Sequence, residues 1–272
     1  EEKLLVLHAA AEVRDAVTLE MDPPALSRFA DAPDAKELAF TLRVRNNLSM
    51  PTLGRCRLEV PQGWRVAPAS AEADLEPGGV ARLPFRVTPP AGVAPGRYAV
   101  RPRLSGDPGD VRGPEVEIRL KREVILGDFE TGADGWTGVV PDAARAQRGR
   151  QSGRWDNHSK TTAITLKEMP HDWSLNDALE FRLFSAKANG AGIQLVLYSH
   201  PEDAREWGNY YQKEIRVDWE GWRHFRIPKE EFIATRKPAG WQQIDSILLT
   251  ASGWYHEPKP DTALWIDDVA LR

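Results

Sequence analysis

The chain has 272 residues, of which 41% are hydrophobic and 28% charged, so it is long enough for two domains of ordinary size. Its formal net charge is −4, and neither half carries the basic excess typical of nucleic-acid binding. The single cysteine, Cys56, excludes an internal disulfide framework and a cysteine-rich zinc site, and no apolar run approaches the ~18 residues of a membrane-spanning helix. The chain begins at Glu1 without a signal-like segment, so we expect a processed or excised part of a longer protein.

Residues 1–123 predict a β-sandwich. Runs of alternating apolar and polar residues are bounded by proline- and glycine-rich turns at intervals of about 8–12 residues, which is typical of an all-β sandwich. Two of the turns are EPGG at 76–79 and PPAGVAPG at 89–96. The predicted strands cover residues 37–47, 55–60, 80–88, 97–105 and 115–123.

The motifs of this half follow a specific order. A strand that ends in RNN is followed by VPQGWRVAP, LEPGGVARLPFRVTPP and APGRYAV. This order resembles the Ig-like modules associated with bacterial α-galactosidases, and the resemblance covers about residues 35–105. It implies a non-catalytic spacer domain with an Ig-like fold, in which the matching residues form turns and core. They are Pro61, Gly63, Trp64, Pro77, Gly78, Phe85, Val87, Pro95, Gly96 and Tyr98.

The segment KREVI, residues 121–125, leads directly into the second half. We therefore place the domain boundary between residues 123 and 124, and a linker this short limits the relative angles of the two domains. Residues 124–272 also predict an all-β domain, a two-sheet jelly roll, with one helical turn within 228–236. The predicted strands cover residues 177–186, 192–200, 210–218, 222–228, 245–254 and 262–271.

Four segments of the second half carry a second resemblance. They are DFETGADGW, EFRLFSAKANGAGIQLVLYS, VDWEGWRHFRIPKEEF and LWIDDVAL, in that order over about residues 125–272. Their order resembles the galactose-binding-like jelly-roll carbohydrate-binding modules of family 11 and of the complex-I-assembly-protein type. The resemblance implies carbohydrate binding, but one fold hosts many specificities, so it does not name the sugar.

Tryptophan is concentrated in the second half. Of the 10 tryptophans, only Trp64 precedes residue 124. Nine are more than one sandwich core usually needs, so we expect some on a surface, where a flat apolar ring stacks on a ligand. Trp136, Trp222 and Trp265 fall within the resembled segments, so we expect these three to be structural.

Carboxylates gather at both ends of the second half, and they predict a calcium site. Asp128 and Glu130 stand in the opening segment, and Asp267 and Asp268 stand in the closing one. The resemblance implies that the first and last strands lie side by side, so that a structural calcium ion held by oxygen ligands from both would tie the ends together. Adjacent strand residues point to opposite faces, so we expect only one of Asp267 and Asp268 to be a ligand. The alternative is that these carboxylates cap turns or pair with basic side chains.

Strand alternation and two long loops define the predicted carbohydrate-binding residues. Several predicted strands carry amide, guanidinium and phenol groups on the face opposite their core residues, and such groups suit bonding to sugar hydroxyls. The loops at 200–211 and 251–260 add aromatic rings. An ordinary solvated sheet face remains the alternative. The predicted residues are Arg182, Tyr198, Trp207, Tyr210, Gln212, Trp254 and Tyr255.

Three functions compete. The leading interpretation is a non-catalytic accessory region of a secreted bacterial glycan-active enzyme, extracellular or periplasmic, which raises the effective concentration of a covalently linked catalytic domain at its polymer. The second is a catalytic jelly roll, a polysaccharide lyase or a glycoside hydrolase, although the sequence lacks the motifs of jelly-roll glucanases and alginate lyases. The third is a pair of structural modules that pack on a catalytic domain. The residues available to the catalytic alternative are Arg182, Tyr198, Gln212, Glu214 and His224.

Overall fold

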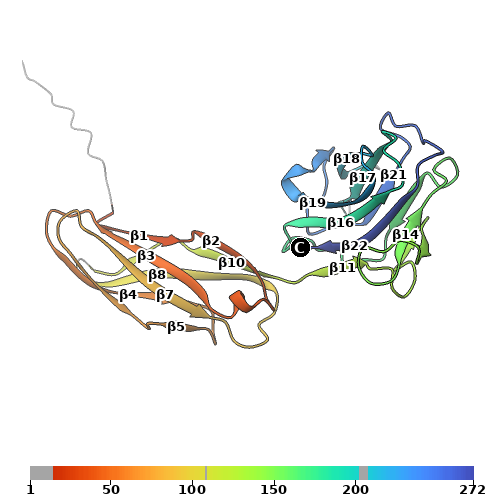
Figure 1. Cartoon of the computed structure of the whole chain (residues 1–272). Helices are drawn as coiled ribbons and strands as arrows, with labels where there is room; N and C mark the ends of the chain where they lie inside the picture. The colour runs from red at the N-terminus through yellow and green to blue at the C-terminus, as the bar shows by residue number, and fades with distance from the viewer. Residues whose placement is uncertain (1–14, 108, 202–207) are drawn as a thin grey trace, which may run out of the picture. The chain divides into compact units, whose positions relative to one another are not determined.

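The computed structural model describes residues 15–107, 109–201 and 208–272 and divides the chain into two compact units, Glu1–Lys121 and Arg122–Arg272. The division falls at residue 121, where the sequence placed it at 123. Each unit is built from β-sheets (Figure 1), which confirms the predicted all-β class. The helical elements among the described residues are two short 3₁₀ turns, η1 (Pro33–Ala35) and η2 (Lys229–Glu231). Within the same residues, no helix is long and apolar enough to cross a membrane.

The first unit contains two sheets. One has the strand order β1-β3-β7-β5, and the other has the order β2-β10-β8-β4-β6, with β9 paired to β8. Neighbouring strands are antiparallel except β2 and β10, which run parallel. The strands are β1 (Val17–Asp22), β2 (Ala25–Phe29), β3 (Leu38–Asn46), β4 (Thr52–Glu59), β5 (Arg65–Ala67), β6 (Ala71–Leu75), β7 (Val80–Thr88), β8 (Gly96–Asp107), β9 (Val111–Arg112) and β10 (Val116–Lys121).

Apolar residues at every second position of the strands form the core of this unit. Strand β3 ends at Asn46, whose side chain is fully buried. Its amide nitrogen donates to the carbonyl oxygens of Met50 at 2.8 Å and of Leu75 and Glu76 at 3.2 Å, and its oxygen accepts from the backbone N–H of Leu48 at 3.0 Å. Because a buried amide must find partners, Asn46 ties together three segments at one end of the sandwich.

The second unit also contains two sheets, which we name the β22 sheet and the β17 sheet. The β22 sheet has the order β13-β14-β22-β16-β19, with β11 paired to β22, and the β17 sheet has the order β12-β15-β21-β17-β18-β20. The strands of the β22 sheet are β11 (Val124–Gly127), β13 (Val140–Asp142), β14 (Ser152–Trp155), β16 (Ala178–Ser185), β19 (Gly221–Pro228) and β22 (Leu264–Leu271). Those of the β17 sheet are β12 (Trp136–Thr137), β15 (Ala163–Leu166), β17 (Gly192–Tyr198), β18 (Tyr210–Arg216), β20 (Ile233–Thr235) and β21 (Ser246–Thr250).

The first and last strands of the second unit are antiparallel neighbours, with Val124 opposite Leu271. The core lies between the two sheets and includes Trp136. Trp265 is also buried, at 8% exposure, although it lies outside the main core cluster, whereas Trp222 is only half-buried. Leu264 and Ile266, which flank Trp265 in the chain, are core residues, so strand alternation turns Trp265 to the outer face.

Candidate functional site

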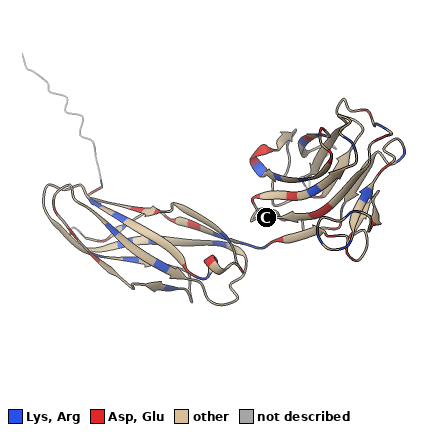
Figure 2. Ribbon diagram, in the orientation of Figure 1, with Lys and Arg blue, Asp and Glu red and all other residues tan. Residues whose placement is uncertain are grey.

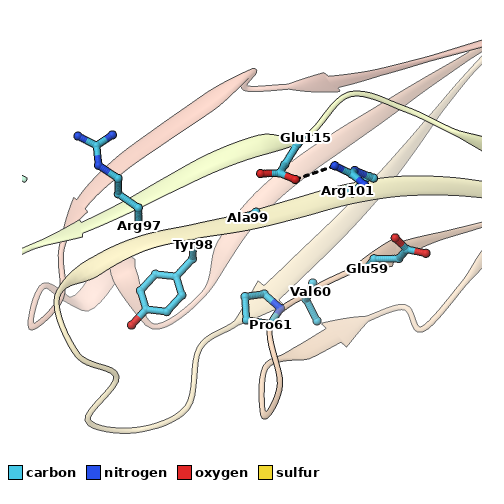
Figure 3. A pocket seen from close by; sticks show the side chains of 8 residues that line it. All are labelled: Glu59, Val60, Pro61, Arg97, Tyr98, Ala99, Arg101 and Glu115. Carbon is cyan, nitrogen blue, oxygen red and sulfur yellow. Dashed lines mark hydrogen bonds and ion pairs between the residues drawn. The ribbon is translucent and has the colours of Figure 1, made fainter.

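The first unit has a hollow of about 410 Å³, lined by residues of β4, β8 and the segments that follow β4 and precede β10 (Figure 3). Its charged side chains all form ion pairs, either within the lining or with residues beside it. Arg101 Nη2 lies 2.7 Å from Glu115 Oε2, and Arg97 Nη1 lies 2.9 Å from Glu117 Oε2. Exposed ion pairs of this kind are common on solvated sheet faces and contribute little. The lining residues are Glu59, Val60, Pro61, Arg97, Tyr98, Ala99, Arg101 and Glu115.

A second candidate is the outer face of the β17 sheet. Strand register places Tyr198 between Ser246 and Tyr210. Two residues earlier on β17, Val196 stands between Leu248 and Gln212. Two residues earlier again, Gln194 stands between Thr250 and Glu214. Because residues two apart on a strand share a face, these three rows form one surface.

Aromatic rings occupy one end of this surface. The ring centroids of Tyr198 and Tyr210 are 5.9 Å apart with 71° between the planes. Those of Tyr210 and Trp254 are 5.7 Å apart with 81° between the planes. The indole N–H of Trp254 donates to the hydroxyl of Tyr210 at 3.2 Å. Each neighbouring pair thus meets edge to face, a favourable arrangement for aromatic rings, and the three rings do not form a flat platform.

Amide groups follow the rings along the same face. Gln194 Nε2 donates to Gln212 Oε1 at 3.1 Å, and Gln212 Nε2 donates to Thr235 Oγ1 at 3.0 Å. Gln194 is only 5% exposed, so its amide is held by its neighbours. This chain of hydrogen bonds fixes the orientation of two planar polar groups beside the aromatic rings.

The loop after β21 presents one more ring. Trp254 and Tyr255 are consecutive residues with φ of 49° and 67°, a conformation that side chains with a Cβ rarely adopt. The side chain of Tyr255 is fully exposed. Strain of this kind persists only where the surroundings hold it, and it is frequent at ligand sites.

A histidine and a tryptophan anchor this loop on the sheet. His256 covers Gly192, whose missing Cβ would stand 2.2 Å from His256 Nδ1. The backbone N–H of His256 donates to Gly253 O at 2.8 Å, and Trp254 packs on Tyr210. The loop is therefore fixed on both sides of Tyr255.

His200 and Asp245 border the same face. Asp245 Oδ2 accepts from the backbone N–H of His200 at 2.7 Å and lies 2.9 Å from His200 Nδ1. Burial alone would raise the pKa of Asp245, but hydrogen bonds from Gln243 and His200 outweigh it and lower the pKa. The ring of His200 stacks on Tyr198 at 5.7 Å, and burial raises the pKa of the Tyr198 hydroxyl, helped by Tyr210.

The structure brings together four of the seven predicted carbohydrate-binding residues: Tyr198, Tyr210, Gln212 and Trp254. Tyr255 stands on the adjoining loop, and Trp207 lies outside the described residues. Arg182 is on β16 in the other sheet, opposite His224. Arg182 therefore does not share a face with the other predicted residues, because β16 and β17 are consecutive in the chain but belong to different sheets.

The predicted set omits His256 and Asp245, which contact this face from loops. The one local signal for His256 is a glycine at the start of β17, since a strand glycine often marks a close approach by another group. The residues of the catalytic alternative are divided between the two sheets. Arg182 and His224 belong to the β22 sheet, and Tyr198, Gln212 and Glu214 belong to the β17 sheet.

The carboxylates at the ends of the second unit bind backbone amides. Glu130 Oε1 accepts from the N–H groups of Arg150 at 2.7 Å and Gln151 at 3.0 Å. Asp128 Oδ1 accepts from the N–H of Glu130 at 3.1 Å. These contacts join the opening segment to the connection between β13 and β14, as turn-capping carboxylates do.

The two adjacent aspartates of β22 differ in their partners. Asp267 Oδ2 accepts from the N–H groups of Gln147 at 2.8 Å and Arg148 at 2.9 Å, and its Oδ1 accepts from that of Asp268 at 2.7 Å. Burial raises the pKa of Asp267 although these N–H groups oppose the shift. The side chain of Asp268 instead lies among guanidinium groups, including that of Arg182 at 3.6 Å.

These contacts do not fit the predicted calcium site. Calcium needs six to eight oxygen ligands, whereas N–H and guanidinium donors point at the oxygens of Glu130, Asp267 and Asp268. Residues 15–107, 109–201 and 208–272 contain no group of three or more His, Cys, Asp or Glu side chains that could hold a metal ion. The arrangement favours the alternative in which these carboxylates cap turns and pair with basic groups.

Comparison with known proteins adds a family match. Residues 35–106 match the family described as "NPCBM-associated, NEW3 domain of alpha-galactosidase". The match confirms the resemblance of the first unit. A search of curated proteins finds no significant match to the chain.

The chain is also similar in structure to carbohydrate-binding modules of three families. A family 30 module has 15% identity and a TM-score of 0.43, with 56% of this chain and 99% of that chain covered. A family 11 module from Clostridium thermocellum, in complex with a β-1,3-1,4-mixed-linked tetrasaccharide, has 17% identity and a TM-score of 0.41, covering 55% and 94%. The "Family 16 Carbohydrate Binding Module-2" has 15% identity and a TM-score of 0.39, covering 55% and 99%.

Proposed function

We propose that the second unit binds a glycan chain on the outer face of the β17 sheet. The observation that carries this proposal is the set of three interlocked rings, Tyr198, Tyr210 and Trp254, beside amides held in place by hydrogen bonds. The apolar C–H face of a sugar packs on an aromatic ring, while its hydroxyls exchange hydrogen bonds with amide groups. The exposed ring of Tyr255 at the rim extends this surface.

The angles between the rings favour a single, soluble glycan chain. A crystalline polysaccharide presents a flat surface and needs coplanar rings, whereas these rings meet at 71° and 81°. The oxygens of Asp245, the carboxylate beside the rings, already accept hydrogen bonds from His200 at 2.7 Å and Gln243 at 2.7 Å. A neutral sugar suits such a face, so we expect an affinity that changes little with salt.

We propose for the whole chain the role of a non-catalytic accessory region of a secreted bacterial glycan-active enzyme, extracellular or periplasmic. The family match of residues 35–106 supports this role, because its description refers to α-galactosidase. The first unit would be a spacer, and the partner would be a covalently linked catalytic domain. Binding of the polymer by the second unit raises the effective concentration of substrate at that domain.

Affinity electrophoresis in gels that contain neutral soluble polysaccharides tests the binding. We expect retardation of the wild-type chain by at least one polymer, and a loss of about tenfold or more in affinity for Tyr210→Ala and Trp254→Ala. Tyr210→Phe keeps the ring and should retain most of the affinity. Leu53→Ala, an exposed apolar position of the first unit, is the matched control and should behave as wild type.

The results that would overturn the proposal are equally specific. Retardation that is the same for wild type, Tyr210→Ala and Trp254→Ala would place the glycan elsewhere. An absence of retardation by every neutral polymer, with a cooperative unfolding transition showing that the protein is folded, would exclude a neutral glycan as the ligand. Release of unsaturated or reducing sugars by the isolated chain would favour the catalytic alternative.

A further inference from the structure

The outer face of the β22 sheet carries a second row of aromatic side chains. Strand register places Phe184 between Trp222 and Trp265. The ring of Phe184 lies 5.6 Å from that of Trp222 at 70°, and 5.5 Å from that of Trp265 at 88°. None of the three belongs to the hydrophobic core cluster. Trp265 is buried at 8% exposure, whereas Phe184 and Trp222 are half-buried and lie on the side of the sheet away from the core.

An arginine covers one end of this row. The guanidinium of Arg145 lies 4.2 Å from the ring centroid of Phe184 and 4.8 Å from that of Trp265. The indole N–H of Trp265 donates to Asp142 Oδ2 at 2.9 Å, and this bond, ahead of other donors, lowers the pKa of Asp142. Phe184 and Trp265 are thus held from above, while half-buried Trp222 stands at the other end of the row.

The neighbouring row places the Arg182 guanidinium opposite the His224 imidazole. Two buried carboxylates lie beneath it. Asp268 contacts Arg148 at 3.2 Å, Arg182 at 3.6 Å and Arg272 at 3.2 Å. Glu180 contacts His224 and Arg226 at 3.2 Å and Arg272 at 3.0 Å.

The exposed fractions of the acidic and basic side chains determine which charge a ligand would contact on this face. The side chains of Asp268 and Glu180 are 9% and 11% exposed. Those of Arg182, His224 and Arg226 are 34%, 42% and 50% exposed. Figure 2 shows acidic and basic positions close together on this sheet, and the exposed fractions show that the basic side chains reach the solvent more than the acidic ones. This face therefore offers guanidinium groups to an anion while the carboxylates hold those groups in place.

We propose that this face is a second binding site, for a carboxylate-bearing saccharide such as a uronate unit. The sugar ring would lie on Trp222, and its carboxylate would bind Arg182 and His224. Residues two apart on a strand are about 7 Å apart, a separation comparable with one sugar ring and its carboxyl group. The proposal is independent of the neutral-glycan site, because it concerns the other sheet and an anionic ligand instead of a neutral one.

Titration calorimetry and affinity electrophoresis with polygalacturonate test this site. The control polymer is carboxyl-reduced polygalacturonate, which has the same chain without the charge. We expect binding to the acidic polymer only, with an affinity that falls as salt rises from 50 to about 500 mM. Trp222→Ala and Arg182→Gln should each lower the affinity by about tenfold or more. Arg55→Gln, an equal change of charge on the first unit, should leave it unchanged.

Three outcomes would overturn the proposal. Equal binding of the reduced and acidic polymers by Tyr210→Ala, in which the first site is disabled, would show that the carboxylate is not recognised. Equal binding of dextran sulfate would indicate a general polyanion surface, and unchanged affinity in both variants would place the contact elsewhere. If Arg182→Gln lacks a cooperative unfolding transition, His224→Gln replaces it with the same expected loss. Neutral polymers assay the first site separately, so the two proposals fail independently.

Discussion

His256 lies directly over Gly192, with its Nδ1 atom 2.2 Å from the position that a Cβ on residue 192 would take. This contact holds the loop that carries Trp254 and Tyr255 against the β17 sheet. No side chain other than hydrogen leaves room for the imidazole ring. The absence of a side chain at Gly192 therefore allows the loop to pack on the sheet and so determines the positions of the Trp254 and Tyr255 rings.

Gly192→Ala should displace His256 and loosen the loop. We expect a loss of about 1–3 kcal/mol in the free energy of unfolding, from overpacking, and a threefold to tenfold loss in glycan affinity, about the value of the misplaced rings. Urea denaturation and affinity electrophoresis measure the two effects. In the double variant Gly192→Ala/His256→Ala the clash is gone, so part of the lost stability should return. Additive losses would contradict the contact.

Stability should fall in mild acid because of His158. Burial lowers the pKa of this fully buried side chain to about 4, against an ordinary value of 6.5. Between pH 6.5 and pH 4 the His158 side chain is protonated in the unfolded chain but not in the folded chain. The free energy of unfolding therefore decreases as the pH falls through this range. The expected loss is about 2 kcal/mol by pH 5 and about 3 kcal/mol in full.

Urea denaturation of wild type and His158→Leu at pH 7 and pH 5 measures this loss. The leucine variant cannot titrate at this position and should show a much smaller change between the two pH values. The ring of His158 stacks on Trp155 at 4.2 Å, so the variant will lose some stability at both pH values. An equal pH response in both proteins would assign the effect to other groups.

Removal of divalent metal should leave the second unit unchanged. The oxygens of Glu130 and Asp267 already accept backbone N–H donors, and these bonds join the same segments that the predicted calcium ion would join. We expect the thermal midpoint in EDTA to equal that in millimolar calcium within about 1 °C. A rise of several degrees with calcium, saturating at stoichiometric amounts, would establish the ion predicted from the sequence.

Asn46→Asp should weaken the first unit. The side-chain nitrogen of Asn46 donates to three carbonyl oxygens, and a carboxylate in its place would face those oxygens without a proton to donate. Leaving buried groups unsatisfied costs about 1–3 kcal/mol, and more for a charged group. Thermal unfolding followed by calorimetry should show one transition lowered and the transition of the second unit retained. A single unshifted profile would contradict this role of Asn46.

Strand alternation predicted which side of each strand faces the core, but it could not assign strands to sheets. The outward positions of Arg182, Tyr198 and Gln212 follow from the period of two. The separation of Arg182 from the other two depends on β16 and β17 joining different sheets, and no local pattern encodes that choice. The contacts of His256 and Asp245 depend likewise on loop conformations, which involve residues distant in the chain.

The number of tryptophans likewise predicted that some would lie on a surface, but it did not predict which ones. Trp254 is placed there by its contact with Tyr210. Trp222 and Trp265 occupy segments that the resemblance associates with the fold, yet Trp265 is buried whereas Trp222 is half-buried and lies outside the core cluster. A motif that fixes a strand does not determine the direction of every side chain on it, because half of the positions on any strand face away from the core.

The pairing of β11 with β22 has a mechanical consequence. Val124 stands opposite Leu271, so the two ends of the second unit lie about one strand spacing, roughly 5 Å, apart. A domain whose ends meet in this way can be inserted into a surface loop of a host protein without stretching that loop. A force that pulls the two ends apart would open the pair from that edge, one hydrogen bond after another, instead of shearing all of its hydrogen bonds together.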